Sequence, residues 1–158
     1  MNRFSLPLAD LIHENISIVM TFAYSRKPLV KAIDEKFLGE WKYLKSFVFD
    51  RAAERAERAC IELAMFLRML DDVEKISDYQ KATRNVQNCG KLIMKNGSEK
   101  KLPIREVANK IIHASNLEWN FEKSPDPVLI CHTTDSEKWL RAEIEILSVA
   151  AFCGGLMG

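Results

Sequence analysis

A heptad pattern between residues 51 and 73 is the feature that most constrains the fold of this chain. Seven apolar residues recur at alternating spacings of four and three: Ala52, Ala56, Ala59, Leu63, Phe66, Leu70 and Val73. This repeat predicts a long helix that packs along one seam against another helix. Because the first half of the seam is alanine, a neighbouring helix can approach closely there. The partner is either another helix of the same chain or the same helix of a second copy.

Two further helices are predicted before this seam. Apolar residues between Leu8 and Ala23 form one stripe, which predicts a helix over residues 6–24. The pattern breaks at 25–28, and Pro28 suits the first turn of a second helix that reaches the upper forties. Gly39 weakens that helix by about 1 kcal/mol without excluding it. Asp50 is a candidate N-cap for the seam helix. The alternative is that the helices over 28–48 and 51–73 form one continuous helix.

The pattern changes in the middle of the chain. Residues 78–88 predict a weaker helix that ends at Gly90. Asn96-Gly97 lies between short apolar and basic segments, which predicts a β-hairpin over about 91–102. Pro103 then suits the entry to a helix over residues 104–115.

Alternating apolar and polar residues predict strands after residue 116. Leu117, Trp119 and Phe121 mark the first strand, and 128–132 form the second. Residues 139–146 alternate in the same way, although a helix also fits their spacing. We favour a strand there, followed by a short helix over 147–153 that ends at Gly154-Gly155.

These elements predict a single domain over residues 1–158 of the α+β class, mostly α. It combines a helical part (6–89), a hairpin (about 91–102), a motif helix (104–115) and a β meander with a short C-terminal helix (117–158). Its 158 residues, 47% of them apolar and 28% charged, suit a soluble globular domain. The chain has no apolar run long enough to span a membrane and no signal-peptide core. We therefore expect a cytoplasmic protein.

The sequence lacks several common catalytic and metal-binding motifs. The four cysteines include no C-x-x-C pair, and no two of the three histidines have the spacing of a helical metal site. Nucleotide-binding glycine motifs are also absent. We therefore expect neither a metal nor a cofactor.

Charge is unevenly distributed along the chain, although the net charge is only +1. Residues 81–113 hold eight basic and two acidic residues, whereas residues 114–158 hold three basic and seven acidic residues. Such asymmetry indicates a site for an anion or for an acidic partner surface. A solvated basic face without a ligand is the alternative.

The helix over 104–115 combines this positive charge with a histidine. At 100° per residue, one face gathers Ile104, Val107, Ala108, Ile111 and Ile112. Asn109 and His113 lie almost opposite, one turn apart, with Arg105 at the edge of their face. An imidazole beside an amide and a cation suits general acid–base chemistry on a phosphodiester. The alternative is that these residues form the solvated side of an amphipathic helix.

The segment R-E-V-A-N-K-I-I-H-A resembles the motif helix of the HEPN family, whose members include metal-independent ribonucleases of toxin–antitoxin and phage-defence systems. Asn109-x-x-x-His113 matches the second part of the family motif, but Ala108 stands where the family has arginine. The resemblance implies Asn109 and His113 as catalytic residues, in a homodimer whose two motif helices face one cleft. Arg105 is our candidate replacement for the missing arginine.

The lysines near this helix are candidates for contact with the RNA backbone. They are Lys91, Lys95, Lys100, Lys101 and Lys110. The first functional expectation is thus a HEPN-like RNA-associated protein, either a ribonuclease or a binding relative of one. The alternative is a non-catalytic helical module that binds an acidic protein partner or assembles with its own copies.

Overall fold

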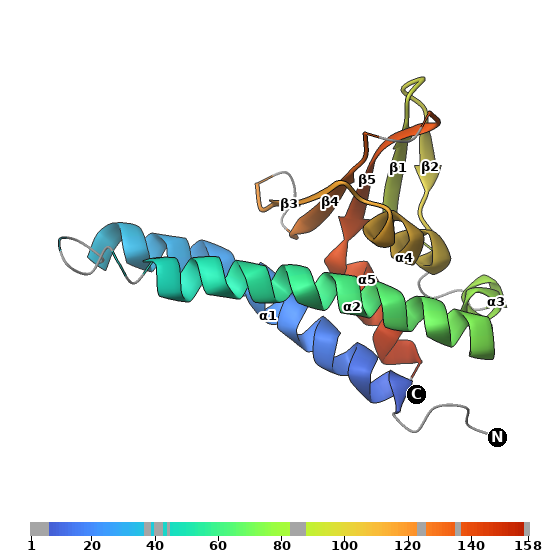
Figure 1. Ribbon diagram of the computed structural model, residues 1–158, viewed down its shortest axis with the longest axis horizontal. Helices are drawn as coiled ribbons and strands as arrows, with labels where there is room; N and C mark the ends of the chain where they lie inside the picture. The colour runs from blue at the N-terminus through green and yellow to red at the C-terminus, as the bar shows by residue number, and fades with distance from the viewer. Residues whose placement is uncertain are drawn as a thin grey trace.

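The protein combines a base of helices with one antiparallel sheet that stands on it (Figure 1). The computed structural model describes residues 7–36, 39, 43, 45–82, 88–122, 126–134 and 137–156. The helical elements are α1 (Leu8–Lys36), the π-helical turn η2 (Ser46–Asp50), α2 (Arg51–Glu74), α3 (Ile76–Ala82), α4 (Ile104–Ile112) and α5 (Ile146–Gly155). The strands are β1 (Gly90–Met94), β2 (Glu99–Lys101), β3 (Asn116–Asn120), β4 (Val128–His132) and β5 (Trp139–Glu145). The predicted α+β, mostly α class is confirmed.

The first helix continues through a proline. α1 includes Pro28 in its interior, so the predicted break at residues 25–28 is wrong. Proline has no N–H to offer the carbonyl one turn earlier, which normally weakens a helix interior. Here Phe22, Leu29 and Ile33 are buried or half-buried along one face of α1. Phe22 packs against the Trp119 ring of β3, and the Arg26 guanidinium lies over the Phe49 ring of η2. Such tertiary contacts of α1 outweigh the local cost of the proline.

The predicted second helix from about residue 28 into the upper forties is interrupted: residues 28–36 belong to α1, and helical backbone is present again at residues 45–50. Gly39 has a φ of 62°, a left-handed conformation that glycine adopts readily and that interrupts a right-handed helix. Several residues of that prediction, among them Phe37 and Trp41, lie outside the described ranges. Asp50 has helical backbone angles and no side-chain cap bond, so its prediction as an N-cap is also wrong. Helical backbone instead continues from η2 directly into α2.

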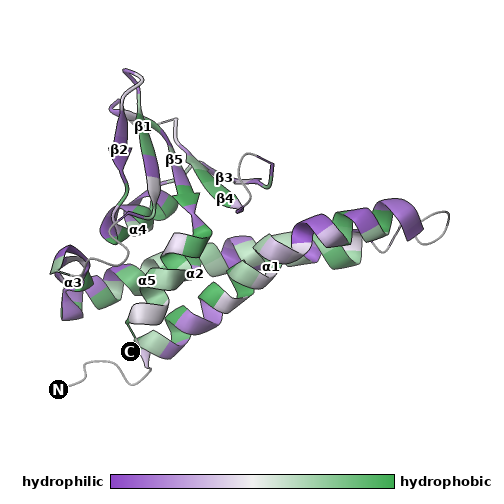
Figure 2. Ribbon diagram, turned by 180° about the vertical axis from the view of Figure 1, so that it is seen from behind, coloured by the Kyte–Doolittle hydropathy of each residue, from purple (hydrophilic) through white to green (hydrophobic). Residues whose placement is uncertain are grey.

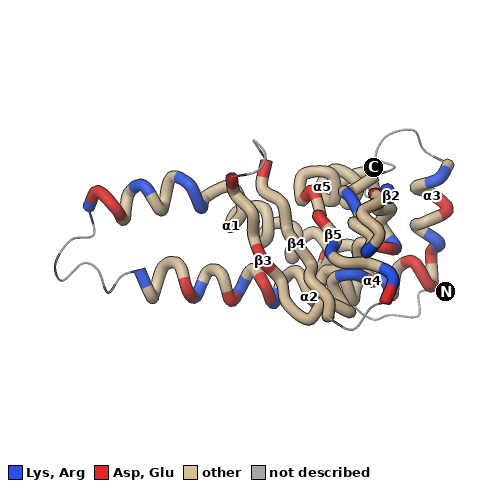
Figure 3. Tube along the Cα trace, turned by 90° about the horizontal axis from the view of Figure 1, so that it is seen from above, with Lys and Arg blue, Asp and Glu red and all other residues tan. Residues whose placement is uncertain are grey.

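The seam of α2 is used inside the chain. α1 and α2 lie side by side as an antiparallel pair (Figures 1 and 3). Ala56, Ala59 and Leu63 are buried, whereas Val73 at the end of the seam is 41% exposed. The helical partner of this seam is therefore α1 of the same chain. None of the described helices has the length and apolar content that a membrane crossing requires.

All five strands form one antiparallel sheet in the order β2-β1-β5-β4-β3. The predicted hairpin is present as β1 and β2, with Gly97 at a φ of 86° in its turn. The predicted strands at 128–132 and 139–146 are also present, so a helix over 139–146 is ruled out. The pairing of β1 with β5 joins the hairpin to the meander.

One residue of β5 departs from the predicted alternation. Leu140 is 46% exposed, whereas Trp139 before it and Ala142 after it are buried. The register between β1 and β5 shifts between Ile93 and Met94, opposite this part of β5. Such a bulge adds a residue to one strand and reverses the faces beyond it, which places Leu140 in solvent.

The two faces of the sheet have different environments. On one face, Leu92, Leu129 and Ile144 belong to a buried cluster that also holds Ile104 and Val107 of α4. We call this the core face. We call the other face the open face. Seen from behind, the part of the sheet that stands above the helical base has no described helix across this face (Figure 2). Antiparallel sheets commonly cover one face and leave the other solvated.

Side chains from the α3 region fix the ends of neighbouring elements. The Gln80 side chain is buried, and its Oε1 accepts the backbone N–H of Ile104 at 2.8 Å. Asn88 Oδ1 accepts the backbone N–H groups of Gly90 and Leu102. These amides therefore satisfy donors that the first turn of α4 and the start of the hairpin would otherwise leave unpaired. Of the predicted helix over 78–88, residues 78–82 are helical in α3, and residues 83–87 lie outside the described ranges.

Gly90 has a different role from the predicted helix end. It opens β1 with a φ of 150°, and a Cβ placed there would lie 2.0 Å from the carbonyl oxygen of Glu143. Only glycine lets β1 approach β5 this closely.

We expect Gly90→Ala to lower the free energy of unfolding by about 3 kcal/mol or more, because the added methyl group collides with backbone atoms of β5. Gly154→Ala in α5 is the matched control, since a Cβ at that position meets nothing within 4 Å. That control should leave stability unchanged or raise it by about 1 kcal/mol. Urea unfolding followed by circular dichroism measures both, and equal midpoints for the two variants would contradict the role of Gly90.

Candidate functional site

The predicted motif helix is present as α4, and its inner face is nearly as expected. Ile104, Val107, Ala108 and Ile111 are buried. Ile112 is 38% exposed, so its assignment to the inner face is wrong. It is the last residue of α4 and lies at the margin of the apolar stripe, where the helix leaves the core.

Asn109 is held by an arginine that the sequence did not point to. Arg68 of α2 donates from Nη1 to Asn109 Oδ1 at 2.8 Å, and Asn109 Nδ2 donates to Glu106 Oε1 at 3.4 Å. Both Arg68 and Asn109 are half-buried. The two residues are 41 positions apart in the chain, so no local pattern could reveal the contact. Asn109 is therefore fixed in orientation rather than freely solvated.

His113 lies where α4 ends. Its backbone N–H closes the last turn on the Asn109 carbonyl at 3.0 Å, and its side chain is exposed. Among the described residues, no hydrogen bond or ion pair engages its imidazole. The imidazole is accessible to a ligand in solvent, one helical turn from the amide that Arg68 holds.

Arg105 serves as an ion-pair partner within the fold. Its Nη1 lies 2.7 Å from Asp71 Oδ2 and 2.8 Å from Asp72 Oδ1, both on α2. The second oxygen of Asp71 accepts the backbone N–H of Ser77 at 2.7 Å and so supports the start of α3. Arg105 thus ties α4 to α2, and the structure does not bring its guanidinium to Asn109.

The Asp71 carboxyl is more acidic than usual. Its burial acts to raise the pKa, but hydrogen bonds from the Ser77 backbone and Arg105, with the positive charge of Arg105, outweigh burial and hold the pKa below its ordinary value. The same two carboxylates raise the pKa of Arg105, chiefly through their hydrogen bonds.

The five predicted lysines separate into different environments. Lys110 Nζ lies 3.3 Å from Glu106 Oε2 and 4.7 Å from the centre of the Trp139 ring. Lys91 Nζ lies 3.7 Å from Glu99 Oε2. The remaining three, Lys95, Lys100 and Lys101, are exposed on the hairpin and make no ion pair within the described ranges.

Strand register divides the hairpin lysines between the faces of the sheet. Lys100 pairs with Leu92, whose side chain belongs to the core, so it points to the side of the sheet on which α4 lies. Lys91 pairs with Lys101, and both point to the open face because successive strand residues alternate. The structure therefore does not gather all five lysines around Asn109 and His113.

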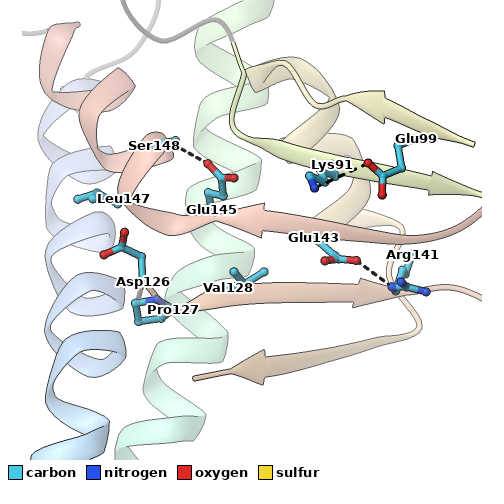
Figure 4. A pocket seen from close by; sticks show the side chains of 10 residues that line it. All are labelled: Lys91, Glu99, Asp126, Pro127, Val128, Arg141, Glu143, Glu145, Leu147 and Ser148. Atoms are coloured by element: carbon cyan, nitrogen blue, oxygen red, sulfur yellow. Dashed lines mark hydrogen bonds and ion pairs between the residues drawn. The ribbon is translucent and has the colours of Figure 1, made fainter. Parts of the chain in front are cut away.

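The open face carries a cleft of about 500 Å³ (Figure 4). Strands β1, β5 and β4 form its floor, and residues 126–127 with the first turn of α5 form one side. Two basic and four acidic residues line it: Lys91, Arg141, Glu99, Asp126, Glu143 and Glu145. The outward alternation of Arg141, Glu143 and Glu145 along β5 is the sequence signal for this surface.

Charges within the cleft neutralise one another. Arg141 Nε lies 3.0 Å from Glu143 Oε2, and Lys91 pairs with Glu99 (Figure 4). The Ser148 hydroxyl donates to Glu145 at 3.0 Å. Since both basic side chains of the cleft are already paired and carboxylates are in excess, this face does not suit a phosphate group.

The cysteines do not form a reactive site. All four are free and buried, and burial raises the pKa of Cys60 and Cys131 to about 12, which keeps both thiols protonated at neutral pH. Within the described ranges, no three His, Cys, Asp or Glu side chains are arranged to hold a metal ion.

Comparisons with known proteins add nothing to the assignment. No family model, curated protein or solved structure matches the chain. The resemblance to the HEPN family thus rests on the residues of α4 alone, and the function must be argued from the geometry of this chain.

The ion pair between Asp71 and Arg105 generates a pH-dependent prediction. Because the folded-state pKa of Asp71 is below its unfolded value, its contribution to stability is present at a pH above the unfolded pKa of about 3.9 and is lost as the pH falls through the lower folded-state pKa. Asp71→Asn should lower the free energy of unfolding at pH 7 by about 1 to 3 kcal/mol and flatten its decline in acid. Urea titrations from pH 7 downward measure this change.

Asp72→Asn is the matched control, since Asp72 binds the same guanidinium but its side chain is 60% exposed. Its effect should be smaller, because exposed ion pairs contribute little. Parallel pH profiles for the wild type and Asp71→Asn would contradict the assignment.

Proposed function

We propose that the protein binds RNA through the hairpin of β1 and β2 together with the adjoining side of α4. The proposal rests on the exposure of Lys95, Lys100 and Lys101, which we call the hairpin lysines, and on the absence of an ion pair to them within the described ranges. They are exposed on an element that projects from the helical base, and none is paired with a carboxylate in the described ranges (Figure 1). Such a lysine binds a phosphate without first breaking an ion pair, and it releases a counterion on binding.

The arrangement of charge supports the hairpin and the α4 side of the sheet over the cleft on the open face. Lys101 points to the open face, but it lies on the edge strand β2 and does not line that cleft. In Figure 3, Lys and Arg gather on β2 and α4 at one end of the molecule. The cleft on the open face, by contrast, has excess carboxylates. RNA rather than any other polyanion is proposed because His113 and Asn109 lie on the same side of the sheet as Lys100. The hairpin lysines supply affinity without sequence choice, since phosphate contacts carry no base information.

A second candidate function is cleavage of the bound RNA without a metal. The specific observation that favours it is the hydrogen bond from Arg68 to Asn109, one turn from the exposed His113. In this proposal the His113 imidazole accepts the proton of a ribose 2′-hydroxyl, whose oxygen attacks the adjacent phosphorus and forms a 2′,3′-cyclic phosphate. The bond from phosphorus to the 5′ oxygen breaks, and the 5′ oxygen takes a proton from water. Asn109 orients the phosphate, and Arg68 stabilises the charge that develops on its oxygens.

The binding proposal predicts a loss of affinity in a triple variant, Lys95→Gln/Lys100→Gln/Lys101→Gln. Fluorescence anisotropy with labelled single-stranded RNA should show affinity reduced about 100-fold, with a salt slope lower by about 2, because each contact to a single strand contributes about 0.7 to that slope. Lys27→Gln/Lys31→Gln/Lys36→Gln removes the same charge from exposed positions on α1 and should leave affinity nearly unchanged.

Equal losses in the two triple variants would show that only net charge matters and would contradict the hairpin as the site. Binding of polyglutamate without binding of RNA would favour the acidic protein partner instead.

The cleavage proposal predicts RNA cleavage that persists in EDTA and falls at least about 100-fold in His113→Ala and Asn109→Ala. His132→Ala is the matched control, because His132 is bound to Glu118 at 2.7 Å on the open face. Each variant should still bind RNA in the anisotropy assay. Cleavage that survives both α4 substitutions, or that is lost equally in His132→Ala, would exclude this chemistry and leave the binding proposal intact.

A further inference from the structure

Lysine side chains lie on both sides of the strand that forms one edge of the sheet. β2 is the last strand, beside β1, and all three of its residues are exposed. Lys100 points to the side of the sheet on which α4 lies, and Lys101 points to the open face. Their Cα atoms are about 3.8 Å apart across one peptide bond, so the two charges flank one thin edge. A single polyanion that contacts both lysines must pass around this edge.

We propose that the RNA bound at this surface is single-stranded and that it crosses the edge of the sheet at β2. This inference rests on the proposed RNA binding and names the class of RNA and its path. The strand contacts Lys101 on the open face, passes the outer edge of β2, and contacts Lys100 on the α4 side. From there it continues toward the side of α4 that carries Asn109 and His113.

The outer edge of β2 is open for such a crossing. Within the described ranges, no strand pairs with this side of β2, because the sheet ends there (Figure 1). The edge of a sheet presents backbone N–H groups without a partner strand, and backbone N–H groups are common donors to phosphate oxygens. The edge therefore adds neutral donors between the two lysine charges.

The charge of the open face limits the path on that side of the sheet. Lys91 lies beside Glu143 of β5 in the strand register, and carboxylates are in excess in the cleft that extends from there. A surface with excess negative charge repels phosphate groups. A strand that binds Lys101 therefore leaves the open face over β2 instead of running across β5.

A duplex does not suit this path. Duplexes are nearly straight over short lengths, since the persistence length of DNA is about 50 nm, so a duplex lies against one face of the sheet. The hairpin also does not fit into a duplex groove, because β1 is joined to β5 along its other edge and the major groove of A-form RNA is deep and narrow. A flexible single strand, by contrast, reaches Lys100 and Lys101 together.

The crossing involves the phosphate backbone and not the bases. Residues 90–102 include no Phe, Trp, Tyr or His, whereas proteins that hold the bases of a single strand stack them on aromatic rings. Contacts to phosphate carry no base information. An unstructured oligouridine is therefore a suitable probe of the crossing.

Single substitutions of the two lysines test the path. Fluorescence anisotropy at several salt concentrations compares labelled oligouridine with a blunt RNA duplex of the same length. On the single strand, Lys100→Gln and Lys101→Gln should each lower the salt slope by about 0.7, and the double variant should lower it by about 1.4. On the duplex, one of the two changes should have no effect, because a duplex contacts one face. A duplex that does not bind supports the same conclusion.

A gain in binding provides a second test that a folding defect cannot mimic. Glu99→Gln removes the carboxylate that lies 3.7 Å from Lys91 Nζ, and so frees that ammonium group on the open-face side of the path. The salt slope on the single strand should rise by about 0.7. Glu54→Gln is the matched control, since Glu54 is also exposed and pairs with Arg51 on α2. This control should leave the slope unchanged.

The outcomes separate this inference from the RNA binding on which it rests. Equal effects of both lysine changes on strand and duplex would overturn the single-strand path and leave RNA binding at the hairpin intact. An effect of only one lysine on the single strand, or an unchanged slope in Glu99→Gln, would confine the RNA to one face of the sheet and would also overturn the path. No effect of either lysine on either RNA would contradict the proposed binding itself.

Discussion

The packing of α2 against two neighbours at once is the interaction on which the rest of the structure depends. One side of α2 receives α1, and a second side receives α4. Ala56, Ala59 and Ala64 are buried along it, and small side chains let helix axes approach closely. Because α4 in turn covers the core face of the sheet, the position of the whole sheet over the helical base follows from how α2 holds α4.

The same helix determines which polar residues of α4 are available for function. Asp71 and Asp72 bind Arg105 and so make that arginine part of the fold. Arg68, one turn earlier on α2, orients Asn109, while His113 is exposed at the C-terminal end of α4. Two arginines that both bridge α2 and α4 thus have different consequences. Arg105 joins the helices through ion pairs, and Arg68 orients the Asn109 amide one helical turn from the exposed His113 imidazole.

Local sequence patterns correctly predicted the helices and strands whose formation depends on residues close together in the chain. The Asn96-Gly97 turn, the alternation in 117–121 and the apolar face of α4 were sufficient to place a hairpin, a strand and a helix. The predictions failed where distant contacts decided the outcome. Pro28 remains helical because α1 gains tertiary contacts with β3 and η2 beside it, and Leu140 faces solvent because a register shift against β1 reverses its side. The contact between Arg68 and Asn109 links two elements across 41 positions, and no single-sequence pattern contains it.

The pairing of β1 with β5 has a consequence for how the chain is made. These strands lie roughly 50 residues apart, whereas β1 pairs with β2 through a short turn. Long-range pairs form late because loop closure must precede them. During synthesis, the hairpin therefore emerges with the inner edge of β1 unpaired until β5 leaves the ribosome. For that interval the hydrogen-bonding groups of β1 are open to other chains, and the lysine charges that surround them provide repulsion against association between nascent copies.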